Sequence, residues 1–391
     1  MDKRLYDFDK MIDRKGTDCL KYDALSMFFG QEDLQPFWVA DTDFETPDFI
    51  LHPIKERLNH PALGYTYRSE EFFQSIIDWQ KKRHNWNINK QWISGTPGVV
   101  SAISSAILAF TEKTDKVIVQ SPVYFPFFQT ITGLDRVVAN NPLRRDGDRY
   151  EMDVDHFEQL AKEGAKMFLL CNPHNPGGMV WDKKTLRRIG EICVQYNIII
   201  VSDEIHSDLI LGDQPHLPIA NISKEISDIT ITLMAPSKTF NIAGLATSFV
   251  ICSNAKVRTS FNKMVNALHI HGGNLLGNIA CEAAYKDGEE WLEQLLDYLK
   301  ENRDTAISYL NKELPKLSVF KPDATYLLWL DFSAYGTEKE IERRLKTDAK
   351  VALNLGSTFG EGGKGFFRFN YGCPKSTMME GLKKMVAAFK D

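Results

Sequence analysis

The sequence lacks any long uninterrupted apolar run. No stretch of about 18 apolar residues without interruption occurs in the 391 residues, so we expect no membrane-spanning helix. The first residues, Met1 to Asp7, also lack the apolar centre of a secretory signal peptide. Both absences favour a soluble, cytoplasmic protein.

Cysteine pairs and a surplus of positive charge are missing as well. Six cysteines are scattered without a Cys-x-x-Cys pair, which predicts reduced and mostly buried thiols rather than disulfides. The net charge of -5 gives no support for binding to nucleic acid or to an anionic membrane. With 43% hydrophobic and 25% charged residues, a globular chain of this length is expected to form two linked domains.

Short β-type runs alternate with helical stretches from about residue 46 to 270. This alternation is typical of βαβ units, in which a mostly parallel sheet lies between helices, and so predicts an α/β fold. A helix is expected from about Gly98 to Phe110, and residues 247–252 are expected to form an antiparallel neighbour in the sheet. The other expected strands are 116–120, 136–139, 167–171, 198–201 and 229–234.

A smaller α+β domain is expected after this region. Residues from about 274 to 310 form one long helical pattern, which we interpret as a connecting helix. Strands are expected at 318–320, 326–330 and 365–369, followed by an amphipathic helix from about Ser376. The N-terminal 45 residues should pack on this part. The predicted division is therefore a large domain at 46–273 and a small domain made of 1–45 and 274–391.

Three of the expected strands end in residues of complementary chemistry. The strand at 229–234 leads to Lys238, the strand at 198–201 leads to Asp203, and the strand at 167–171 leads to Asn175. The carboxyl ends of parallel strands line the ligand crevice of an open sheet. An amine, a carboxylate and an amide meeting there suit pyridoxal 5'-phosphate (PLP): a Schiff base to the amine, a partner for the ring nitrogen and a donor to the ring oxygen.

A phosphate site is predicted where the helix at about 98–110 begins. Thr96 is interpreted as the N-cap and Pro97 as part of the first turn. The free N–H groups of Gly98, Val99 and Val100 would then face an anion, and the hydroxyl of Ser237 would add a further donor. Most capped helices bind no anion, so this prediction depends on the neighbouring lysine strand.

Each candidate also has a simpler interpretation. Asp203 would serve equally as a helix N-cap or in an ion pair. Together with Glu204, His206 and Asp208 it could also suggest a metal site. Alternating residues of a strand face opposite sides, however, which makes a metal site unfavourable. We therefore expect no metal. Tyr124 follows a strand and would stack on a ring or simply pack in the core. Arg368, flanked by aromatic residues, would hold a substrate carboxylate in two hydrogen bonds or form a structural salt bridge.

These residues together resemble the fold-type-I PLP enzymes, the aspartate aminotransferase superfamily of class I/II aminotransferase-like proteins. The resemblance covers nearly the whole chain and implies a seven-stranded, mostly parallel sheet in the large domain. Several stretches are similar to the cysteine-S-conjugate β-lyase (cystathionine β-lyase) branch of that superfamily. They are residues 38–44, 64–66, 120–128, 203–208 and 370–374, whereas residues 237–241, Asp203 with Glu204, and 175–177 carry the resemblance to the superfamily as a whole.

The resemblance implies a role for each candidate residue. Lys238 would carry the cofactor and act as the catalytic base, Asp203 would pair with the ring nitrogen, and Arg368 would bind the substrate α-carboxylate. A homodimer is implied, in which Tyr65 reaches the phosphate of the neighbouring subunit. The remaining implied contacts are Asn175 to the ring oxygen and the substrate, Tyr124 and Ile205 to the two ring faces, His206 to the cofactor, and Val39 and Ala40 to the substrate.

Two positions depart from the usual aminotransferase pattern. His206 stands where many members have tyrosine, and Ala246 stands where many have a phosphate-binding arginine. Both departures are tolerated in the β-lyase branch. The predicted function is therefore PLP-dependent cleavage of a cysteine thioether to thiol, pyruvate and ammonia. An aminotransferase and a PLP-binding regulatory protein with a residual site are the alternatives.

Overall fold

The computed structural model describes residues 6–390, and its centre is a seven-stranded sheet. Only β10 runs antiparallel to its neighbours, so the sheet is mostly parallel, as predicted. Across the sheet, the strands are β2 (Ile93–Thr96), β10 (Ser248–Ile251), β9 (Thr230–Met234), β8 (Ile199–Asp203), β7 (Met167–Cys171), β3 (Lys116–Val119) and β4 (Val137–Asn140).

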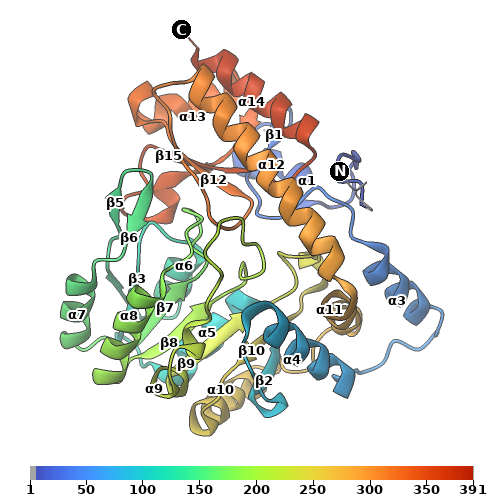
Figure 1. Ribbon diagram of the computed structural model, residues 1–391, viewed down its shortest axis with the longest axis vertical. Coiled ribbons are helices and arrows are strands. Elements are labelled where there is room, and N and C mark those ends of the chain that lie inside the picture. The colour runs from blue at the N-terminus through green and yellow to red at the C-terminus, as the bar shows by residue number, and fades with distance from the viewer. Residues whose placement is uncertain (1–5, 391) are drawn as a thin grey trace.

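Helices cover both faces of this sheet because its central strands are apolar on both sides (Figure 1). In β7, Met167 and Leu169 pack with α5, α6 and α10, whereas Phe168 and Leu170 pack with α7 and α8 on the opposite face. The helices of the sheet region are α3 (Asp48–Leu58), α4 (Glu70–His84), α5 (Val99–Phe110), α6 (Pro126–Gly133), α7 (Val154–Lys162), α8 (Lys183–Gln195), α9 (Lys224–Asp228), α10 (Ala255–Ala267) and α11 (Leu275–Asp287).

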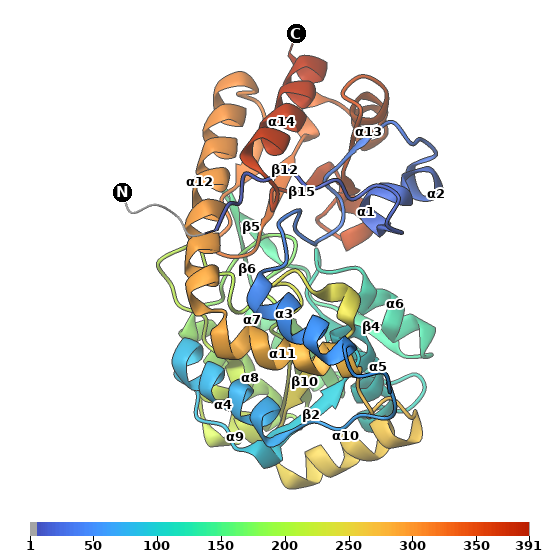
Figure 2. The same ribbon diagram turned by 90° about the vertical axis from the view of Figure 1, so that its right-hand side faces the viewer.

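A second, antiparallel sheet lies in the C-terminal region, in the upper part of Figure 2. Its strand order is β11 (Ser318–Phe320), β12 (Leu327–Asp331), β15 (Phe366–Asn370) and β14 (Asn354–Leu355). The helices α12 (Glu289–Glu313), α13 (Glu338–Thr347) and α14 (Lys375–Phe389) belong to the same region. The expected strands and the closing helix of this region are thus confirmed to within one or two residues.

The N-terminal segment joins the C-terminal region through β1 (Gln35–Pro36), which pairs in parallel with β13 (Val351–Ala352). Two short helices precede it, α1 (Leu20–Asp23) and α2 (Leu25–Phe29). A separate hairpin is formed by β5 (Arg144–Asp146) and β6 (Arg149–Glu151), and single 3₁₀ turns span 90–92, 219–221, 243–245, 333–335 and 356–359.

The single connecting helix expected over 274–310 is wrong, because the chain forms two helices there. Gly288 ends α11 and begins α12. A Cβ atom at Gly288 would lie 2.4 Å from the ring of Phe240 and 2.2 Å from a backbone oxygen, so only glycine fits this junction. Helix α11 packs against α3 and α4 of the sheet region, while α12 extends alongside both regions (Figure 2). The domain boundaries at 46 and 274 stay a prediction.

Two absences complete the description of residues 6–390. No helix among them is both long enough and apolar enough to cross a membrane. All six cysteines are buried and none of them forms a disulfide. Cys171, at the end of β7, is the one that reaches the cavity described next.

Candidate active site

A cavity of about 220 Å³ opens at the carboxyl ends of β7, β8 and β9. Asn175 follows β7, Asp203 is the last residue of β8, and Lys238 follows β9. The parallel strands run in register, so their ends meet at one edge of the sheet and bring these three side chains to one cavity.

The amine of Lys238 lies partly buried in this cavity. Its Nζ donates a hydrogen bond to the carbonyl oxygen of Ala40 at 2.6 Å. Burial lowers the pKa of Lys238 below its usual range because it disfavours the charged ammonium. The carboxylates of Asp41 and Asp203 oppose this lowering, while the charge of Arg368 adds to it. The neutral amine form is therefore more populated in Lys238 than in an exposed lysine.

The carboxyl group of Asp203 is 5% exposed and has few protein partners. One oxygen accepts a hydrogen bond from the backbone N–H of Ile205 at 3.2 Å, and no helix begins at Asp203. Among the described residues, no cation forms an ion pair with it, so Asp203 acts neither as a helix N-cap nor in an ion pair. Burial raises the pKa of Asp203 to about 7, although the Ile205 N–H and the Lys238 charge act in the opposite direction. A cationic donor in the cavity would stabilise its ionised form.

The guanidinium of Arg368 is buried without a carboxylate. It donates to the side-chain oxygen of Asn175 at 3.0 Å, to the carbonyl of Trp38 at 2.8 Å and to the side-chain oxygen of Asn354 at 2.7 Å. Its Nε has no partner. Within residues 6–390 it makes no ion pair, so the predicted alternative of a salt bridge is wrong. Burial lowers the pKa of Arg368 to about 10. A buried cation of this kind favours an anionic ligand.

The helix start differs in detail from the prediction. Thr96 belongs to β2 and its hydroxyl bonds the hydroxyl of Ser248 at 2.7 Å, so it does not cap the helix. Gly98 is the N-cap of α5, without a side-chain cap. The first-turn N–H groups have no partner within the helix. The lining of the cavity here consists of Gly98, Val99, Val100, Ser101, Ser237, Ala246 and Thr247, of which sequence reasoning missed Ser101 and Thr247.

The other predicted contact residues divide into two groups. Tyr124, Ile205, His206 and Ala40 line the cavity. Burial lowers the pKa of His206 to about 3, so its imidazole is neutral, and its Nδ1 has no hydrogen-bond partner. Val39 and Tyr65 do not line the cavity. The Val39 carbonyl accepts from Asn370, and Tyr65 is fully exposed beside Gly272 and Gly273.

Carboxylates near Asp203 form a buried network with histidines rather than a metal site. Glu204 bonds His216 at 2.7 Å. Asp208 accepts hydrogen bonds from Trp79 and Thr239 at 3.0 Å and lies 3.1 Å from Nε2 of His84. No group of three or more potential metal ligands occurs in residues 6–390. Sequence reasoning missed His84, which lies far from the site in the chain, and His216, which follows Glu204 in a loop and carries no local signal.

Comparisons with known proteins agree with this geometry. The model of the aminotransferase class I and II family matches residues 39–385. The chain belongs to the class I and II aminotransferase family. This confirms the predicted resemblance and fold. The chain is 42% identical to cystathionine beta-lyase PatB of Bacillus subtilis, over 97% of this chain and 99% of that protein.

Two further relatives lie within the same family. Protein MalY of Escherichia coli is 34% identical and covers 99% of both chains. The crystal structure of cystalysin from Treponema denticola, which contains PLP, superposes with a TM-score of 0.96 at 35% identity and 99% coverage of both chains. The similarity therefore extends over the whole large and small parts of the fold.

The lining of the cavity carries few cationic side chains. Of the described residues that line it, Lys238 is the only lysine or arginine, and Ala246 supplies no cation. Tyr326, which sequence reasoning missed, donates from its hydroxyl to the Ala40 carbonyl at 3.0 Å. An aromatic residue at the start of a strand is usually a core residue, so no signal marked it beforehand.

Proposed function

We propose that this protein is a PLP-dependent carbon–sulfur β-lyase. It would split L-cystathionine or a related L-cysteine thioether into a thiol, pyruvate and ammonia. The observation that carries the proposal is the buried guanidinium of Arg368, which lacks a carboxylate and lies beside the cavity that holds Lys238 and Asp203. Its similarity to cystathionine beta-lyase PatB over nearly the full length of both chains supports the same conclusion.

The residues present fit PLP. Lys238 offers a partly buried amine for the covalent link, and Asp203 offers a carboxylate oxygen without a protein cation. The unpaired N–H groups at the start of α5, together with Ser237, suit a phosphate. When bound, PLP supplies an electron-poor ring that disperses the negative charge left at the substrate Cα.

The side chains in and beside the cavity would each have a separate role in the reaction. Arg368 would bind the α-carboxylate, with Asn175 holding the guanidinium in place through its side-chain oxygen. Tyr124 and Ile205, which both line the cavity, would confine a flat ring between them. Lys238 would remove the proton from Cα, which its lowered pKa favours. The thiolate then leaves the β-carbon. Asp203, in its ionised form, would keep the ring nitrogen protonated.

An aminotransferase is the second candidate because the family includes such enzymes. Transamination of a dicarboxylic amino acid needs a further cation for the side-chain carboxylate. Arg368, which lies beside the cavity, is assigned to the α-carboxylate, and no arginine is among the described residues that line the cavity, so no second cation is seen there for a side-chain carboxylate. This arrangement favours the lyase.

We also propose that the protein is a homodimer with shared active sites. Tyr65 and Tyr67 are exposed, as is Leu63, on a segment without helix or strand. Exposed apolar groups of this kind mark interaction surfaces. Tyr65 of one subunit would reach the phosphate of the other. Sedimentation velocity of the purified protein tests this, and a monomer at micromolar concentration would contradict it.

The catalytic proposal is tested with purified, PLP-saturated protein and L-cystathionine, without an added keto acid. Thiol and pyruvate are followed together. The expected result is equal release of both, and loss of release in Lys238→Ala but not in the control Lys81→Ala, which changes an exposed lysine. A shift of the cofactor absorbance to the amine form without thiol release would instead establish an aminotransferase.

A further inference from the structure

Five consecutive main-chain carbonyls, from Trp38 to Thr42, all accept hydrogen bonds from side chains. Two of these donors are proposed active-site groups: Arg368 donates to Trp38 at 2.8 Å, and Lys238 donates to Ala40 at 2.6 Å. The other donors are Asn370 to Val39 and Asp41 at 2.6 Å, Tyr326 to Ala40 at 3.0 Å, and Arg14 to Thr42 at 3.0 Å. Segment 38–42 thus connects Arg368, which is proposed to bind the substrate carboxylate, to the amine of Lys238.

Ligand binding draws on these same donors. A cofactor on Lys238 would compete for the N–H that the Ala40 carbonyl accepts. A substrate carboxylate at the two free N–H groups of Arg368 would act on the same guanidinium that bonds the Trp38 carbonyl. The position of segment 38–42 during turnover then depends on the donors that contact no ligand. These are Asn370, Tyr326 and the groups behind the segment.

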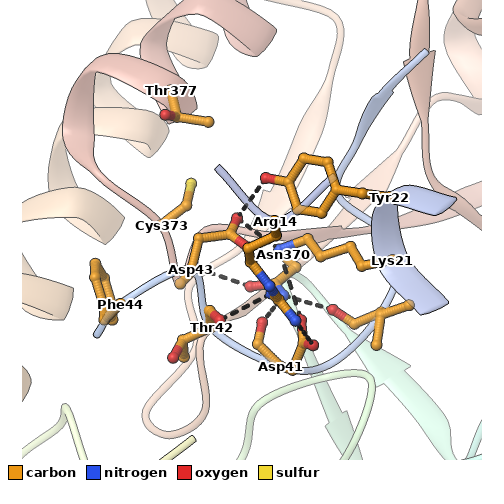
Figure 3. Close-up of polar contacts among 12 residues, drawn as sticks. Arg14, Lys21, Tyr22, Asp41, Thr42, Asp43, Phe44, Asn370, Cys373 and Thr377 are labelled. Atoms are coloured by element: carbon orange, nitrogen blue, oxygen red, sulfur yellow. Dashed lines mark hydrogen bonds and ion pairs between the residues drawn. The ribbon is translucent and has the colours of Figure 1, made fainter. Parts of the chain in front are cut away.

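Behind the segment lies a buried ion network (Figure 3). Arg14 bonds Asp41 at 2.6 Å and Asp43 at 2.7 Å, and Lys21 bonds Asp43 at 2.8 Å. Tyr22 donates to the same Asp43 oxygen at 3.1 Å. The Lys21 side chain is fully buried, and that of Asp43 is 5% exposed. Arg14 and Asp41 are partly exposed, at 21% and 18%. The two cations and two carboxylates balance in charge, and salt screens the buried Lys21–Asp43 pair only weakly.

We propose that Arg14 and Lys21 are positioning residues for the reaction. Through Asp41 and Asp43 they hold segment 38–42, so that its carbonyls keep Lys238 and Arg368 aligned when cofactor and substrate bind. Arg14 has the more direct role because it also bonds the Thr42 carbonyl. This inference rests on the proposed lyase function and assigns a task to Arg14 and Lys21, neither of which lines the cavity.

The test compares Arg14→Gln and Arg14→Lys with a matched control, Arg145→Gln. Arg145 also forms a partly exposed pair with an aspartate, Asp331, at 2.6 Å, and it does not line the cavity. We expect Arg14→Gln to raise KM for the thioether about tenfold with kcat changed less than about threefold, since alignment for binding is lost. Arg14→Lys keeps the charge and should recover part of the loss. Arg145→Gln should leave KM unchanged.

A second measurement needs no activity. The backbone N–H of Asp43 donates to Gly372 at 2.8 Å, and that of Thr42 donates to Asn241 at 3.2 Å. Hydrogen exchange at residues 38–44 of the cofactor-free protein should be faster in Arg14→Gln than in Arg145→Gln. If Arg14→Gln does not fold, Arg14→Lys gives the same comparison.

The outcomes separate the two proposals. Faster exchange in the Arg14 variant of a protein whose wild type releases no thiol would overturn the lyase function and leave the positioning role supported. Equal KM and equal exchange in the Arg14 and Arg145 variants of an active lyase would overturn the positioning role. Loss of stability without a change in KM relative to the control would also overturn it.

Discussion

Replacing Arg368 by lysine tests the carboxylate site most directly. Three of the five guanidinium N–H groups are engaged by Asn175, Trp38 and Asn354, which leaves two for a substrate. Lysine keeps the positive charge, but its single ammonium nitrogen cannot place two parallel N–H groups on the two carboxylate oxygens as the guanidinium does. A hydrogen bond to a charged group contributes about 1.5–3 kcal/mol, so kcat/KM for L-cystathionine should fall by roughly 10- to 150-fold.

The assay pairs this substrate with an analogue that lacks the α-carboxylate. Steady-state thiol release gives kcat/KM for L-cystathionine, and competitive inhibition gives the affinity for the analogue. The Arg368→Lys change should lower kcat/KM for the substrate and change the affinity for the analogue by less than about threefold, because the lost contact is made only to the carboxylate. Equal weakening of both compounds, or a loss below about threefold in kcat/KM, would refute the assignment. Urea unfolding of both proteins checks that the variant is folded.

Three further predictions concern groups around the cavity. Asp203 has a folded-state pKa of about 7 against an ordinary value of 3.8, so the native cofactor-free protein binds the extra proton and loses stability as pH rises through this window. Asp203→Asn should remove that loss. The prediction is contradicted if the difference in urea midpoint between Asp203→Asn and wild type is the same at pH 4 and at pH 8. Thr239→Val deprives buried Asp208 of a donor and should cost about 1–3 kcal/mol in urea unfolding. Thr232→Val, whose buried hydroxyl has no partner, is the control and should be near neutral, so equal costs would count against the network. Tyr65→Phe should weaken PLP binding, measured by cofactor titration, without altering monomer stability, and unchanged affinity would exclude its phosphate contact.

The strands that deliver the site could be predicted because they are continuous apolar runs. Met167 to Cys171 and Thr230 to Met234 are buried on both faces, so their carboxyl ends and the polar residues that follow are visible in the sequence. β2 was missed because Thr96 and Pro97 have the chemistry of a helix start. Tertiary pairing with β10 decided otherwise. The break between α11 and α12 at Gly288 was missed because the sequence pattern is helical on both sides of it.

Contacts made by the backbone could not be predicted in the same way. The carbonyls of segment 38–42 carry no side-chain signature, and their donors come from positions as distant as Arg14 and Arg368. The buried pairing of Glu204 with His216 likewise depends on how the chain turns after β8. The sequence shows which groups are present at a strand end, whereas the fold decides which partner each one meets.

The burial of the cysteines has a chemical consequence for an enzyme that releases thiols. Cys171 lines the cavity in which a thiol product would form. Burial raises the pKa of the Cys171 thiol far above its usual range, and the nearby Asp203 charge adds to this effect. Only thiolates attack disulfides at useful rates. At neutral pH, an oxidised form of the product would therefore meet an unreactive sulfur at Cys171.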